Sequence, residues 1–93
     1  ETRYDAGLSA CTLAARRAMQ ALKLDINRED SHAQWSAVDA RTADSTPVRI
    51  RCDSDGTKTR ATFVAGEAKT DDTLALARRL KEEFEKSLGF EGN

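Results

Sequence analysis

The two cysteines, Cys11 and Cys52, are the residues of this chain with the widest choice of chemistry. A thiol can act as a nucleophile, join a second thiol in a disulfide, or serve as a small apolar core residue. Both positions fall on apolar stripes that we expect to face a core, and the sequence indicates no His or acidic residue placed to act as a base for either one. Two alternatives stay open, namely two free buried thiols, or a disulfide if the Cα atoms lie within about 7 Å.

The other metal-ligating residues do not form a pattern typical of a site. His32 is the only histidine, and a zinc site needs at least two further ligands at a suitable spacing. Asp53, Asp55 and Gly56 match a fragment of a calcium loop. However, Arg51 stands at the first ligand position, the final Glu is missing, and Asp-Gly is typical of a hairpin turn. We therefore expect no metal, no cofactor and no enzymatic activity.

Four arginines are the strongest candidates for a binding surface. Side-chain parity predicts that they share the face of a sheet that carries no helix: Arg41, Arg49, Arg51 and Arg60. Guanidinium groups bind phosphate and carboxylate in a bidentate manner. However, charged residues are also expected on the solvent-exposed face of an antiparallel sheet that binds nothing. Cross-strand pairs with Asp25 and Asp39 would neutralise part of this arginine surface.

Trp35 is the second binding candidate, and its placement depends on a local irregularity. The alternation of its strand is imperfect, because Trp35 has odd parity whereas the apolar Val38 has even parity. A bulge near Ser36 would reconcile them and turn the indole into the core. Without the bulge Trp35 is exposed, as interface tryptophans are.

Two periodicities predict the elements that position these residues. Apolar residues spaced alternately four and three apart predict a helix that is capped at Asp5 and runs to Leu22. Alternating apolar and polar residues predict four strands, near residues 24–27, 34–42, 48–53 and 60–65. A second helix is predicted from Thr70 to a stop at Gly89.

Each predicted helix is apolar on one side only. The economical arrangement packs both helices on one face of an antiparallel sheet. We therefore predict a single α+β domain over residues 1–93, with a four-stranded antiparallel sheet and the order α-β-β-β-β-α.

Composition argues against two classes of partner. The chain has 15 Lys and Arg against 16 Asp and Glu, a net charge of -1, which disfavours nucleic acid as the main partner. The arginine-bearing face also lacks the stacking aromatics of single-strand-binding sheets. No apolar run approaches the roughly 18 residues of a membrane span, and the chain shown contains no signal segment.

Several segments together carry a family resemblance. They are Tyr4-Asp5, the Ala-rich helix ending in Leu22-Lys23-Leu24, residues 39–44 followed by 48–50, and residues 59–66. Over nearly its whole length the chain resembles the bacterial domain of unknown function 3568. Members of that family look like small exported proteins or lipoproteins without a catalytic motif.

The resemblance implies a compartment and not a reaction. It implies a periplasmic protein or an anchored lipoprotein, an envelope protein as partner, and membrane attachment only through an upstream lipid anchor. We expect a non-enzymatic binding or assembly module of the bacterial cell envelope. The alternative is a domain that binds small anions or acidic ligands on the arginine-rich sheet face.

Overall fold

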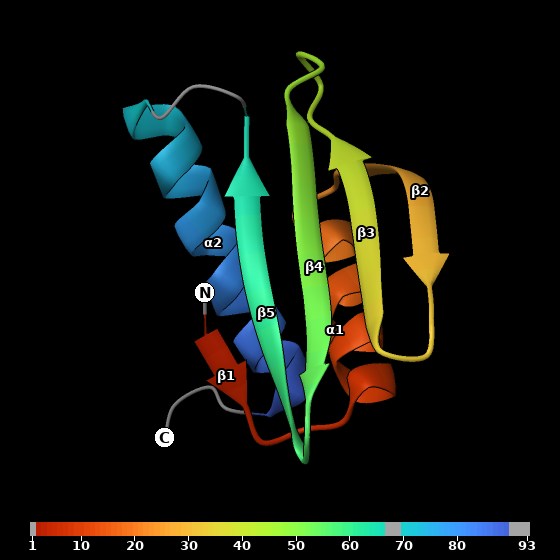
Figure 1. Cartoon of the computed structure of the whole chain (residues 1–93). Coiled ribbons are helices and arrows are strands. Elements are labelled where there is room, and N and C mark those ends of the chain that lie inside the picture. The colour runs from red at the N-terminus through yellow and green to blue at the C-terminus, as the bar shows by residue number, and fades with distance from the viewer. Residues whose placement is uncertain (1, 67–69, 90–93) are drawn as a thin grey trace.

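The computed structural model describes residues 2–66 and 70–89, which form one antiparallel sheet and two helices. The elements in chain order are β1 (Thr2–Tyr4), α1 (Leu8–Ala21), β2 (Asp25–Ser31), β3 (Trp35–Arg41), β4 (Pro47–Asp55), β5 (Lys58–Ala65) and α2 (Asp71–Leu88). The sheet order is β1-β5-β4-β3-β2, and both helices lie behind the sheet in Figure 1. The α+β class is confirmed, but the sheet has five strands instead of the predicted four.

The additional strand is β1, which lies just before the predicted helix and was not predicted as a strand. Tyr4 pairs with Thr59 in β5, and its ring centroid lies 5.1 Å from that of Phe84 in α2. Its hydroxyl donates to Glu85 Oε2 at 2.8 Å. Because these partners are distant in sequence, local periodicity could not indicate them. The predicted cap at Asp5 is also wrong, since α1 begins after Gly7 without a side-chain cap.

The predicted bulge near Ser36 is wrong as well. β3 pairs with β4 without a shift from the Trp35–Asp53 pair to the Arg41–Pro47 pair. The register shift lies in β2 instead, between Ile26 and Arg28. Regular pairing of β3 therefore places Trp35 and Val38 on opposite faces of the sheet.

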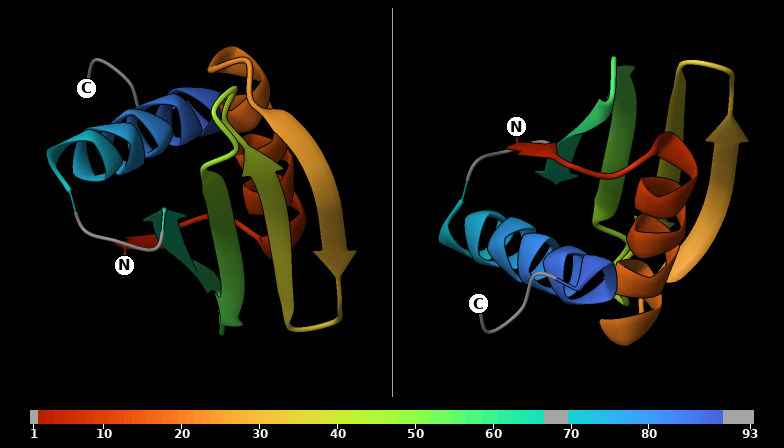
Figure 2. Two further views of the ribbon diagram at one scale, coloured as in Figure 1. Left: turned by 90° about the horizontal axis from the view of Figure 1, so that it is seen from above. Right: turned by 90° about the horizontal axis from the view of Figure 1, so that it is seen from below.

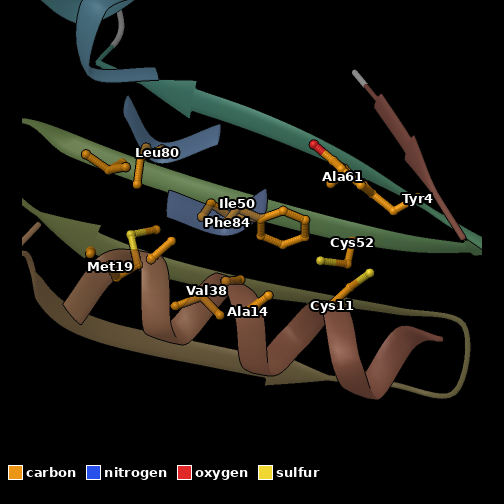
Figure 3. Packing of buried hydrophobic residues seen from close by; sticks show 14 residues of the cluster. Tyr4, Cys11, Ala14, Met19, Val38, Ile50, Cys52, Ala61, Leu80 and Phe84 are labelled. Atoms are coloured by element: carbon orange, nitrogen blue, oxygen red, sulfur yellow. The ribbon is translucent and has the colours of Figure 1, made fainter. Parts of the chain in front are cut away.

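The core lies between the sheet and a helix layer formed by α1 and α2 (Figure 2). Its α1 side is built of small residues, and Figure 3 shows how the labelled core side chains meet there. The fully buried α1 residues are Cys11, Ala14, Ala15, Ala18 and Met19. From α2, Leu80 and Phe84 are fully buried, and Phe84 meets Phe63 edge to face with centroids 5.2 Å apart. Small side chains on α1 let the helix lie close to the strands that it covers.

The ends of α2 agree with the sequence prediction. Thr70 is the N-cap, and a reciprocal pair of hydrogen bonds joins it to Thr73. Gly89 ends the helix in the left-handed conformation at φ 87°. Gly66 follows β5 at φ 73°, and a Cβ atom there would lie 2.7 Å from Thr73 Cγ2. The end of β5 and the first turn of α2 therefore approach closely only because residue 66 is glycine.

Candidate binding surface on the open face of the sheet

The four predicted arginines lie on the sheet face opposite α1 and α2, which we call the open face. The register sets Arg49 and Arg51 of β4 on this face, while Val48, Ile50 and Cys52 of the same strand are buried toward the helices. Arg41 of β3 and Arg60 of β5 share the open face by the same register. Figure 1 looks onto this face, with the helices behind the sheet. The parity argument therefore predicted the side of the sheet correctly.

Arg49 is held by a carboxylate of the neighbouring strand, and Arg41 by a backbone carbonyl. Asp39 lies directly opposite Arg49, which donates from Nε to Oδ1 at 2.7 Å and from Nη2 to Oδ2 at 3.1 Å. The hydrogen bonds to Asp39 and its negative charge raise the pKa of Arg49. The predicted neutralisation by Asp39 is thus confirmed. Arg41, opposite Asp25 in the register, donates from Nη1 to the Ser45 carbonyl at 3.1 Å.

Arg51 belongs to a compact group at the β2–β3 hairpin end of the open face, which we call the Trp35 cluster: His32, Trp35, Arg51 and Asp53. Arg51 Nη2 donates to Asp53 Oδ1 at 3.0 Å, and Arg51 Cζ lies 4.4 Å from the centroid of the Trp35 ring. The His32 ring stacks on Trp35 with centroids 4.3 Å apart and an interplanar angle of 23°. The half-buried indole is therefore held by two neighbours.

His32 was not predicted as part of a binding surface, although the sequence contains a signal for it. His32 and Trp35 flank the two residues Ala33 and Gln34, and the His32 backbone N–H donates to the Trp35 carbonyl at 2.8 Å. Residues on either side of a two-residue hairpin loop face one another across the strand pair. β2 continues to Ser31, beyond the strand predicted near residues 24–27, and the two-residue hairpin loop that follows brings the two rings together.

A groove of about 540 Å³ occupies the opposite end of the open face. Its lining includes Arg28, Arg41, Arg49, Asp39 and Val64. Val64 is 46% exposed, so the groove has an apolar wall beside its charged side chains. Of the four predicted arginines only Arg41 and Arg49 line this groove, whereas Arg51 lies in the Trp35 cluster. The structure therefore divides the predicted arginine set between two places.

The cysteines lie on the other side of the sheet, in the core. Cys11 of α1 and Cys52 of β4 are both free thiols, with exposed fractions of 0% and 1%. Of the two alternatives that the sequence left open, the structure contains the free buried pair.

Metal and membrane features can be stated for the described residues. Within residues 2–66 and 70–89, no group of three or more His, Cys, Asp or Glu side chains could hold a metal ion. Across the same part of the chain, no helix has the length and apolar character needed to cross a membrane. The hairpin turn predicted at Asp-Gly is present: Asp55 is the last residue of β4 and pairs with Lys58, and the two loop residues are Gly56, with φ 68°, and Thr57.

Comparisons of the chain with protein-family models, with curated proteins and with solved structures found no match. The resemblance to the domain of unknown function 3568 therefore stays a prediction.

Proposed function

We propose that this chain is a non-enzymatic binding module that captures a protein partner on the open face of its sheet. The observation that carries the proposal is the Trp35 cluster, in which a half-buried indole is fixed between His32 and Arg51. Tryptophan and arginine are the residues most enriched among those that dominate binding energy at protein interfaces. A side chain already held in one orientation loses little conformational entropy when a partner docks on it.

The charge pattern around the cluster favours a protein over a polyanion. Arginines on or beside the open face pair with acids: Arg49 with Asp39, Arg51 with Asp53, Arg28 with Asp30, and Arg3 with Asp55. Alternating charges of both signs give a surface of low net potential, which suits a partner that also presents both signs. A polyanion such as nucleic acid would instead have to compete with each carboxylate for its arginine.

The compartment is part of the proposal and derives from the family resemblance. Tyr4-Asp5 and the segment 59–66 belong to the pattern that suggests small exported proteins or lipoproteins. We accordingly propose that the partner is a protein of the bacterial cell envelope.

Partner capture with matched variants tests this function. Wild-type protein and the variants Trp35→Ala and Arg51→Glu are each cross-linked in an envelope fraction, and the captured proteins are identified by mass spectrometry. Leu13→Ala is the control, because Leu13 is a 39% exposed apolar residue of α1, away from the open face. We expect one specific partner to be captured by wild type and Leu13→Ala, and its capture to fall at least about tenfold in both open-face variants.

The proposal fails if all four proteins capture the same partner equally while their circular dichroism spectra show that they are folded. A loss of capture in Leu13→Ala alone would assign binding to the helix layer instead.

The groove supports a second candidate function, the binding of small anions. Three guanidinium groups line it, from Arg28, Arg41 and Arg49, against one carboxylate from Asp39. An incoming phosphate would have to displace Asp39 from Arg49, so removal of that carboxylate should tighten binding.

Inorganic phosphate titrated calorimetrically at low salt tests the second candidate. We expect Asp39→Asn to bind phosphate more tightly than wild type, Arg49→Gln to bind it more weakly, and added salt to weaken all three. Absence of heat with wild type and Asp39→Asn alike would remove this candidate and leave the protein-binding proposal untouched.

A further inference from the structure

Cys11 and Cys52 form a pair in the core, although they are distant in sequence. Cys11 projects from α1 and Cys52 from β4, and Figure 3 shows them beside one another where the helix covers the sheet. Both belong to the same buried cluster, with exposed fractions of 0% and 1%. Each thiol has the largest influence on the pKa of the other, as expected of close neighbours.

The small residues around the pair allow this contact. On α1, Ala14, Ala15 and Ala18 are at most 1% exposed and lie against the sheet. On the sheet side, Cys52 pairs with Ala61 of β5. A helix surface and a strand surface made of such short side chains approach closely, so a thiol from each can meet.

The hydroxyl groups near the pair direct their protons elsewhere. Thr59 Oγ1 donates its only proton to the Ala6 carbonyl at 2.7 Å. Thr12 Oγ1 donates to the Leu8 carbonyl at 2.8 Å, so in its 2.6 Å contact with Ser36 Oγ the proton comes from Ser36. Neither Thr59 nor Ser36 therefore has a proton left to donate to a thiol.

This arrangement gives the two thiols different pKa values. The interaction with Cys52 lowers the pKa of the Cys11 thiol. The same interaction, together with burial, raises the pKa of Cys52. Cys11 is thus the better placed of the two to supply the attacking thiolate in a thiol–disulfide exchange.

We propose that Cys11 and Cys52 are a reversible redox pair whose disulfide pins α1 to β4. With a disulfide of the glutathione class as oxidant, the Cys11 thiolate attacks one sulfur, forms a mixed disulfide and releases one glutathione thiolate. The Cys52 thiolate then attacks the Cys11 sulfur and releases the second. Two electrons pass to the oxidant, and the two protons of the cysteines end on the two glutathione thiols.

Complete burial sets the conditions under which this exchange takes place. Glutathione disulfide is too large to reach a thiol that is 0% exposed in the packed core. The first step therefore needs α1 to move away from the sheet, during folding or in a local opening. The disulfide closes a long loop, and it should stabilise the native state by restricting the unfolded chain.

Oxidation of the full chain by glutathione disulfide tests the pair. Wild-type protein is incubated with the oxidant in native buffer and in urea below the unfolding midpoint. It is then denatured and alkylated with iodoacetamide, and its intact mass is measured by mass spectrometry. We expect wild type to lose two hydrogens and to take up no alkyl group, at a rate that rises with urea. The oxidised protein should melt about 10 °C or more above the reduced protein.

A matched control moves one thiol to the outside of the same helix. The double variant Cys11→Ala with Leu13→Cys keeps two thiols, but Leu13 is 39% exposed on α1. We expect it to form no intramolecular disulfide in native buffer. The proposal is overturned if wild type keeps two alkylatable thiols in every condition, or if its oxidised form melts at or below the reduced form. The open face carries no part of this pair, so either result leaves partner capture to be judged independently.

Discussion

Arg51 lies across the face of Trp35, with its Cζ atom 4.4 Å from the ring centroid, because Asp53 holds it there. Asp53 is the residue directly opposite Trp35 in the β3–β4 ladder, and it accepts hydrogen bonds from Nε and Nη2 of Arg51. Asp53 thus positions Arg51, which lies two residues earlier on β4, over the indole of Trp35 on β3.

A double-mutant cycle on Trp35→Leu and Arg51→Gln should measure this contact. We expect a coupling free energy of about 0.5–1 kcal/mol, since a cation at a partly exposed aromatic face contributes about that much. Urea unfolding followed by circular dichroism provides the four stabilities. The control cycle combines Trp35→Leu with Arg49→Gln, because Arg49 is bound to Asp39. The effects of these two substitutions on stability should be additive within error. Equal coupling in both cycles would contradict a specific contact with the ring.

Two truncations to alanine on α2 should differ sharply in the free energy of unfolding that they cost. Phe84 is fully buried between Tyr4 and Phe63, so Phe84→Ala should lower the free energy of unfolding by about 3–5 kcal/mol. Leu74 is 52% exposed, and Leu74→Ala should cost less than about 0.5 kcal/mol. Thermal and urea unfolding of both variants check the difference. Comparable losses would mean that the N-terminal turn of α2 packs more tightly than the structure shows.

The hydroxyl group of Thr59 should contribute to the stability of the fold. It is 1% exposed and donates to the Ala6 carbonyl in the connection between β1 and α1. Thr59→Val keeps the shape but leaves that carbonyl without its donor, so we expect a loss of about 1–3 kcal/mol in urea unfolding. Thr57→Val, in the exposed turn between β4 and β5, is the isosteric control and should be nearly neutral. A neutral Thr59→Val would show that the Ala6 carbonyl finds another donor.

Alkaline pH should destabilise the fold through Tyr4, the only tyrosine of the chain. Burial and the hydrogen bond to Glu85 raise the pKa of Tyr4 above its ordinary value of 10.0. The folded state therefore keeps this proton to higher pH than the unfolded state does. The contribution is complete below pH 10.0 and is lost as the pH rises above it.

Tyr4→Phe should remove that dependence. We expect the variant to be less stable than wild type at neutral pH, because the Glu85 carboxylate loses its donor, but to lose less stability between neutral and alkaline pH. Urea midpoints measured across this range, together with the tyrosinate absorbance of wild type, check it. Tyrosinate that forms well before unfolding would contradict the raised pKa.

Most of the regular elements could be read from periodicity alone. The alternation in Pro47–Asp55 and Lys58–Ala65 is a property of neighbouring residues, and it predicted both the strands and the face on which Arg49 and Arg51 lie. The Thr70 cap and the Gly89 stop are likewise local, because they depend on hydrogen bonds and backbone conformations within one turn.

The failures concern residues whose placement depends on distant partners. Tyr4 joins β1 because Thr59 pairs with it and Phe84 packs against it. Trp35 faces outward because β3 keeps an unbroken register with β4, while the bulge occurs in β2. Neither strand pairing nor bulge position is encoded in the local alternation of apolar and polar residues.

The sequence by itself determined most of the helical and strand residues and the side of the sheet on which the arginines lie, because these follow from the geometry of a helix and of a strand. Only the tertiary structure decided which charges pair, that His32 and Arg51 hold Trp35, and that Cys11 meets Cys52. Those relationships depend on strand order, register and the close approach of an alanine-rich helix, which arise when segments far apart in the chain pack together.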